Sequence, residues 1–157
     1  MITTYRLVQL IEEDAAEMAS GLVNKIERDP HAAGYLNHVP APELWKRVHE
    51  IYRHLGEWLF SSTPAEVELR YREIGARRAE QRLPLSQLLH VILATKEFLW
   101  EYVRTHRHPV EPVSEVLADL ELQLQLDQFY SRAVVFAAAG YEERAEQPAR
   151  ARSIPAA

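Results

Sequence analysis

His90 suggests chemistry because it stands in the middle of the long apolar stretch LSQLLHVILATKEFLW, residues 85–100. An imidazole in such a place can accept a phosphoryl group or ligate a haem iron. At about 100° per residue of helix, however, His90 lies about 140° from the apolar stripe, beside Glu97 and Glu101. We therefore expect a surface or half-buried histidine, with a phosphoacceptor and an axial haem ligand as the alternatives.

Arg78 and Lys96 are charged residues that fall on apolar helix faces. Lys96 lies about 20° from Leu85 on the apolar stripe, and Arg78 continues the apolar line of Tyr71 and Ile74. An unpaired buried cation is unstable, so each needs a partner or a route to water. Either the side chains run along apolar neighbours to the surface, or they line an internal polar pocket that holds carboxylates or an anionic ligand. We name both as candidate pocket residues.

The remaining polar motifs give no assembled reactive site. HEIYRH, residues 49–54, resembles the HExxH zinc pattern, but His49 and His54 are five residues apart and so point about 140° apart on a helix. The sequence has no GxSxG, P-loop or GxGxxG motif and no ExxH pair. We predict no catalytic residue, no metal site and no cofactor.

Composition limits the class of protein further. The chain has 157 residues, 47% of them hydrophobic, which suits one domain with a core. Its net charge of −5 argues against a general nucleic-acid surface, and the lack of cysteine excludes disulfides and thiolate chemistry. The acidic N-terminus does not resemble a signal peptide, and no apolar run approaches the ~18 residues that span a membrane. The sequence predicts a cytoplasmic protein.

The elements that must position these residues are all helices. Periodicity of the helical type recurs along the chain, and prolines interrupt it at Pro30 and Pro84. Thr63 and Glu66 form a predicted capping box at the start of one helix. We predict an all-α globular bundle of five helices, over about 4–29, 42–61, 63–82, 84–105 and 113–146, forming one domain (1–146) with a long C-terminal helix and a disordered tail (147–157).

The last predicted helix carries two apolar stripes on nearly opposite faces. The first stripe is Leu117, Leu120, Leu124, Val135 and Ala138, and the second stripe is Leu122, Leu126, Phe129, Ala133, Phe136 and Gly140. A helix that is apolar on two sides is normally buried on both. Either the helix lies at the centre of its own bundle, or one stripe forms a homodimer seam. For the seam we name Leu122, Leu126, Phe129 and Phe136.

Four stretches of the chain resemble one family. They are REIGARRAEQRLPLSQLLHVILATKEFLWEYV, KIERDP, LWKRVHEIYRHLGEWL and FYSRAVVFAAAGYEE, which fall within about residues 5–146. The pattern IGxxRA…LPL…LW resembles the N-terminal domain of RsbT co-antagonist proteins of the RsbRD type. The family pattern maps onto Ile74, Gly75, Arg78 and Ala79 in one helix and onto the corner 83–85. Arg82 departs from it, because a small residue is usual before the corner.

The resemblance implies an all-helical input domain of bacterial signalling that has no assigned catalytic residues. In that family the domain commonly precedes STAS output domains, sensor kinase modules or transcription-regulator segments. No such output domain follows here, so the chain is either a stand-alone relative or a portion of a larger protein.

We therefore expect a non-enzymatic signal-transduction domain of stress-response regulation that binds other signalling proteins and forms a homodimer, without nucleic-acid or membrane contacts. The alternatives are a haem- or small-ligand-binding sensor of globin-like size and a histidine phosphotransfer domain.

Overall fold

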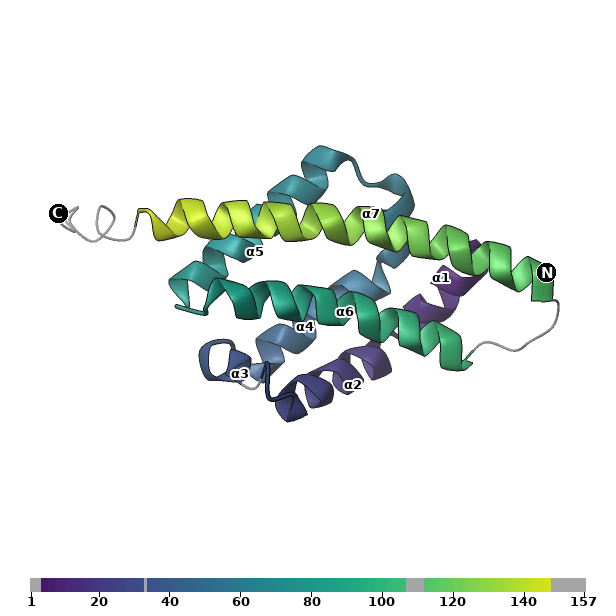
Figure 1. The fold of residues 1–157 in the computed structure, drawn as a ribbon, viewed down its shortest axis with the longest axis horizontal. Helices are drawn as coiled ribbons and strands as arrows, with labels where there is room; N and C mark the ends of the chain where they lie inside the picture. The colour runs from purple at the N-terminus through teal and green to yellow at the C-terminus, as the bar shows by residue number, and fades with distance from the viewer. Residues whose placement is uncertain (1–3, 33, 107–111, 148–157) are drawn as a thin grey trace.

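The structure, a computed structural model, describes residues 4–32, 34–106 and 112–147, and these residues form helices without any strand. The predicted all-α fold with a long C-terminal helix is confirmed, and α7 extends along most of the long axis of the molecule (Figure 1). In chain order the elements are α1 (Thr4–Glu13), α2 (Ala15–Arg28), α3 (Tyr35–His38), α4 (Ala41–Arg53), the π-helical turn η1 (Glu57–Ser61), α5 (Pro64–Glu80), α6 (Leu85–His106) and α7 (Pro112–Ala145).

The first predicted helix is divided into α1 and α2 at Asp14. Asp14 has φ −101° and ψ 16°, outside regular helix geometry, although its backbone carbonyl still accepts a hydrogen bond from the N–H of Met18. Its carboxylate accepts a hydrogen bond from the hydroxyl of Tyr102 on α6. A tertiary contact to the Asp side chain thus accompanies the bend, and helical periodicity does not reveal such a contact.

The second predicted helix also breaks, between α4 and η1. α4 ends at Arg53, with His54 as its C-cap, and the π-helical turn η1 begins after Gly56. The N–H of Gly56 donates to the carboxylate of Glu12 on α1, 3.1 Å away. The Glu12 carboxylate thus satisfies the part-buried backbone N–H of Gly56 where the regular helix is interrupted. The short helix α3 lies in the segment that the prolines predicted as a connector.

α5 begins with the predicted capping box and ends in a Schellman motif. Thr63 and Glu66 exchange backbone and side-chain hydrogen bonds. At the other end the N–H of Leu83 donates to the carbonyl of Arg78 at 3.1 Å, while Arg82 has a φ of 61°. The left-handed position of this motif usually holds glycine. The predicted corner at 83–85 is therefore a helix C-cap with an arginine in a strained conformation.

α5 and α7 pack with their backbones in contact at two glycines, which we call the glycine seam. A Cβ atom at Gly75 would lie 2.0 Å from the carbonyl oxygen of Ala137, and one at Gly140 would lie 2.3 Å from that of Arg72. Neither position has room for any side chain. The Gly75 of the family pattern is therefore explained by the close approach of two helices.

The stripe of α7 that we named as a homodimer seam faces the core of this chain. In the second stripe Leu122, Leu126 and Phe129 are buried in the core of this chain, and Phe136 is half-buried against it. The Phe129 ring packs edge-on against Tyr71 and Tyr130. These side chains are occupied within the chain. The first stripe faces outward instead, with Leu117, Leu120, Leu124 and Val135 each more than half exposed.

Two further predictions concern the chain as a whole. The predicted tail at 147–157 lies outside the described residues except for Gln147, and the single-domain boundary at 146 stays a prediction. Within the described ranges, no helix combines the length and the apolar character needed to cross a bilayer.

Candidate functional site

Lys96 and Arg78 lie in different places. The ammonium of Lys96 reaches the carboxylate of Asp127 on α7 at 3.0 Å, and its side chain is 29% exposed. It therefore follows the first of our two interpretations, a side chain that extends to the surface. Arg78 is 1% exposed and lies inside the bundle. Of these two residues, only Arg78 can contribute to an internal polar site.

Arg78 pairs with Glu43, which stands in the first turn of α4. One terminal nitrogen of Arg78 donates to the Glu43 carboxylate and to the side-chain oxygen of Gln81, the latter at 2.8 Å. Arg77 and the amide of Gln81 also donate to Glu43. The Glu43 carboxylate thus receives hydrogen bonds from three side chains of α5 and its C-cap.

The protonation of Glu43 follows from this set of donors. Partial burial alone would raise the pKa of Glu43. Hydrogen bonds from Arg77 and Gln81 and the charge of Arg78 outweigh this effect, and they bring the pKa to about 2, below its ordinary value of 4.5. Glu43 is therefore ionised near neutral pH, as a buried arginine partner must be.

A second ion pair joins the same two helices about two helical turns further along α4. Arg70 of α5 binds the carboxylate of Glu50 of α4. The acids on α4 and the arginines on α5 thus occur in opposite order along the chain, as antiparallel helices require. The α4–α5 interface, which we call the polar seam, consists of the Glu43–Arg77, Glu43–Arg78 and Glu50–Arg70 pairs.

A small cavity of about 50 Å³ lies beneath the polar seam, between α4, α5 and α6. We call it the arginine cavity because Arg47, Arg70 and Arg78 contribute to its lining. The rest of the lining is mostly aliphatic and aromatic: Tyr35, Leu44, Val48, Ile51, Tyr52, Tyr71, Ile74, Leu88, Val91, Ile92 and Thr95.

The arginines of the cavity have donors without partners. The Nε atoms of Arg70 and Arg78 are buried and make no hydrogen bond within the described part of the chain. Arg47 has neither a hydrogen bond nor an ion pair of its own among the same residues. Burial and the charges of Arg70 and Arg78 lower the pKa of Arg47, although a guanidinium stays charged in proteins. The cavity therefore has a positive potential.

The tyrosines of the cavity are uncharged. Burial raises the pKa of Tyr52 and of Tyr71 well above the usual value of 10.0, and it raises the pKa of Tyr35 as well. The hydroxyl of Tyr52 donates to the backbone carbonyl of Thr95 at 2.7 Å. Neutral phenols in these positions are unsuited to act as bases.

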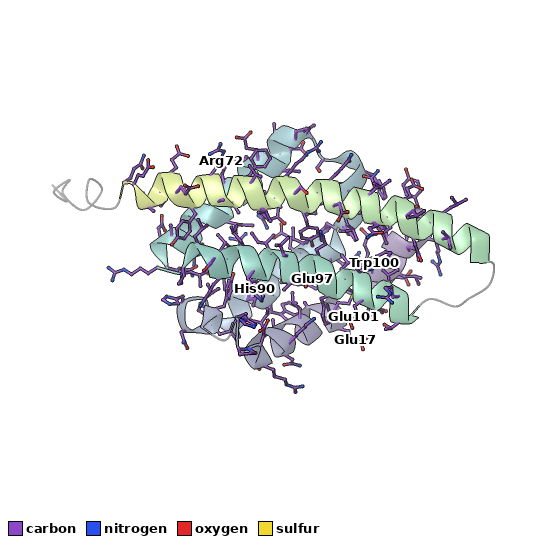
Figure 2. The ribbon with its side chains drawn as sticks, viewed as in Figure 1. Glu17, Arg72, His90, Glu97, Trp100 and Glu101 are labelled. Atoms are coloured by element: carbon purple, nitrogen blue, oxygen red, sulfur yellow. The ribbon has the colours of Figure 1, made fainter. Side chains whose placement is uncertain are left out.

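His90 lies on the outer face of α6, as its position in the sequence predicts. Its side chain is 41% exposed, and Nε2 lies 3.0 Å from the carboxylate of Asp29. This hydrogen bond lowers the pKa of Asp29, together with one from the backbone of His31. Figure 2 shows His90, Glu97 and Glu101 following one another along α6. No group of three or more potential metal-binding side chains occurs within the described ranges.

The sequence pattern missed Glu43, Arg47 and Arg70 as parts of an internal site. On α4, helical periodicity places Arg47 and Glu50 on the polar face opposite the apolar stripe, and in the structure both residues border α5. A signal for the polar seam does exist in the sequence. The acids at 43 and 50 and the arginines at 70 and 77 share a spacing of seven residues, so two antiparallel helices bring both pairs together.

A comparison with protein-family models identifies the chain. The model of the RsbT co-antagonist protein rsbRD N-terminal domain matches residues 15–153. The chain belongs to this family. It is therefore a regulatory signalling domain, and the resemblance seen in its sequence is confirmed. Comparisons with curated proteins and with solved structures give no match.

The structure gives the RsbRD signature a physical meaning. Gly75 is required by the glycine seam, and Arg78 is the buried cation of the polar seam. Leu83, which is fully buried, is held by two contacts at the corner, since its N–H donates to Arg78 and its carbonyl accepts a 2.6 Å hydrogen bond from Tyr141. The motif residues thus fix how α5 sits against α4, α6 and α7.

Proposed function

We propose that this RsbRD N-terminal domain is a non-enzymatic, cytoplasmic regulator that acts by association, and that it forms a homodimer through the first stripe of α7. The observation that carries the proposal is the exposure of this stripe. Leu117, Leu120 and Leu124 are 63%, 52% and 66% exposed, and Val116 beside them is 53% exposed. Contiguous exposed apolar side chains of this kind mark interaction sites.

The spacing of the stripe suits a second copy of the same helix. Leu117, Leu120 and Leu124 follow a three-then-four pattern, which is that of a coiled-coil seam. A twofold axis through the stripe would place each leucine against the same surface of the other copy. Two exposed acids beside the stripe have partners within the chain, since Glu121 accepts a hydrogen bond from Thr4 and Asp127 pairs with Lys96.

The proposed dimer can be tested by light scattering after size exclusion over a micromolar concentration series. We expect the wild-type chain to reach twice the mass of one chain, and Leu120→Glu to remain monomeric with an unchanged circular dichroism spectrum. Leu69→Glu is the matched control, because Leu69 is 63% exposed on α5, away from the stripe. A wild-type monomer at high micromolar concentration, or a dimer that survives Leu120→Glu, would contradict the proposed dimer.

The other functions considered from the sequence have weaker support. Haem ligation by His90 is disfavoured because this side chain is on the surface and bonded to Asp29. The arginine cavity, at about 50 Å³, is also far smaller than a haem pocket. For a phosphotransfer role, the surface position of His90 is compatible, but no other described feature of the site supports it.

A further inference from the structure

The arginine cavity has more positive charge than its own carboxylates neutralise. Arg47, Arg70 and Arg78 line it, and the neighbouring carboxylates of the polar seam are Glu43, which pairs with Arg78, and Glu50, which pairs with Arg70. Three cations against two anions leave an excess of one positive charge, in a chain whose net charge is −5. Such a local excess against the overall charge favours an anion at this place.

Two of the arginines that line the cavity also have a buried donor that an anion could satisfy. Arg78 is almost completely buried, lines the cavity, and has an Nε–H without a partner in the described structure. The Nε–H of Arg70 is in the same situation. Buried donors are nearly always satisfied in folded proteins, and leaving one unpaired is unfavourable. An acceptor with negative charge would satisfy both.

Access to the cavity is provided at Arg47. This side chain borders the arginine cavity and also the open groove on the surface of α4, where Lys46 and Arg77 lie as well. Because Arg47 has no ion pair of its own among the described residues, it can turn to an incoming anion without breaking an ion pair.

The size and walls of the cavity restrict the anion. A cavity of about 50 Å³ is roughly a third of the volume that accepts benzene, so it holds only a few non-hydrogen atoms. Val48, Val91 and Ile92 are among the aliphatic side chains that line the cavity together with the arginines. A tetrahedral oxoanion would direct some of its oxygens at these walls. A carboxylate has two oxygens, which match guanidinium donors, and its carbon chain suits the aliphatic side.

We propose that the arginine cavity is a binding site for a small carboxylate with a short apolar chain, of the size of acetate or propionate, held by Arg47, Arg70 and Arg78. This binding site is separate from the homodimer proposed above, because the experiment below follows only groups that line the cavity. The outcome is therefore independent of whether the chain dimerises.

The test is a titration of the full chain with sodium propionate at constant ionic strength, followed by the NMR signals of the arginine Nε–H groups. We expect the signals of Arg70 and Arg78 to shift and saturate with a dissociation constant on the order of 1 mM, as a ligand of few atoms allows. Sodium chloride should leave them unchanged. The absence of a saturable shift up to about 50 mM would overturn the proposal, as would equal, saturable shifts with inorganic phosphate.

Two variants test separately the positive charge of the cavity and its volume. Arg47→Gln should weaken propionate binding about tenfold or more, while Arg53→Gln, an exposed arginine on the same helix, should leave it unchanged. Val91→Ile adds one methyl group to the cavity wall without altering any charge, and it should also weaken binding. Circular dichroism checks that each variant is folded. Wild-type affinity in both Arg47→Gln and Val91→Ile would place the anion elsewhere and refute the site.

Discussion

α5 is held on two sides by interfaces of opposite construction. Towards α7 the glycine seam brings backbone against backbone, with no space for a side chain at Gly75 or Gly140. Towards α4 the polar seam joins the helices by ion pairs above a cavity. The first interface depends on shape and tolerates no added atom. The second depends on charge and leaves room for a small molecule. The comparison shows that one helix can combine a rigid contact and an adaptable one.

The largest effect should come from filling the glycine seam. Gly75→Ala places a methyl group where backbone atoms of α7 already lie, so the helices must separate. We expect the free energy of unfolding in urea to fall by about 3 kcal/mol or more, the upper end for an overpacked contact. Gly56→Ala is the control, since a Cβ there meets its nearest neighbour at 3.4 Å and the residue has a helical φ of −59°. Equal stability of Gly75→Ala and wild type would refute the proposed rigidity of this contact.

The polar seam should respond to charge and to pH. Glu43→Gln leaves Arg78 buried without a carboxylate, and we expect a loss of about 2–3 kcal/mol at pH 7. Because folding lowers the pKa of Glu43 from 4.5 to about 2, its stabilisation is present above pH 4.5 and is lost as the pH falls towards 2. The difference between wild type and variant, measured by urea unfolding, should therefore shrink from pH 6 to pH 3.

A control for this prediction is the half-exposed Glu68–Arg72 pair. Glu68→Gln should change stability by at most about 0.5 kcal/mol, because exposed pairs contribute little. A difference between wild type and Glu43→Gln that stays constant down to pH 3 would contradict the assigned role of the Glu43 carboxylate.

The smallest effect is expected at the corner where the polar seam ends. Arg82 holds a φ of 61°, a conformation that glycine adopts without strain. Arg82→Gly should therefore raise the free energy of unfolding by about 0.5–1 kcal/mol. Arg82→Ala removes the same side chain but keeps a Cβ, so thermal or urea unfolding should show no comparable gain. A similar gain in both variants would mean that the side chain, and not the backbone, is responsible.

Much of the fold follows from local signals in the sequence. The capping box of Thr63 and Glu66, the stop at Pro84 and the inward position of Arg78 could all be predicted, because each depends on residues close together in the chain. The breaks at Asp14 and Gly56 could not. In both, a side chain from another helix meets the interrupted segment, Tyr102 in one case and Glu12 in the other.

The candidate site was only partly predictable for a related reason. Periodicity identifies two apolar stripes on α7, but it does not say which one the rest of the chain covers. Here the inward stripe is the one with small residues at Ala133 and Gly140, which allow close packing against α5. Likewise, a charged residue on α4 looks the same in a sequence whether it meets water or an opposite charge, and so periodicity alone does not identify Glu43 and Arg47 as parts of an internal site.

The glycine seam has a mechanical consequence for the whole molecule. With backbone atoms touching at Gly75 and Gly140, α5 cannot slide or roll without carrying α7 with it. α7 has 34 residues and is about 51 Å long. A displacement of α5 at its contact with α4 would therefore be transmitted directly to α7.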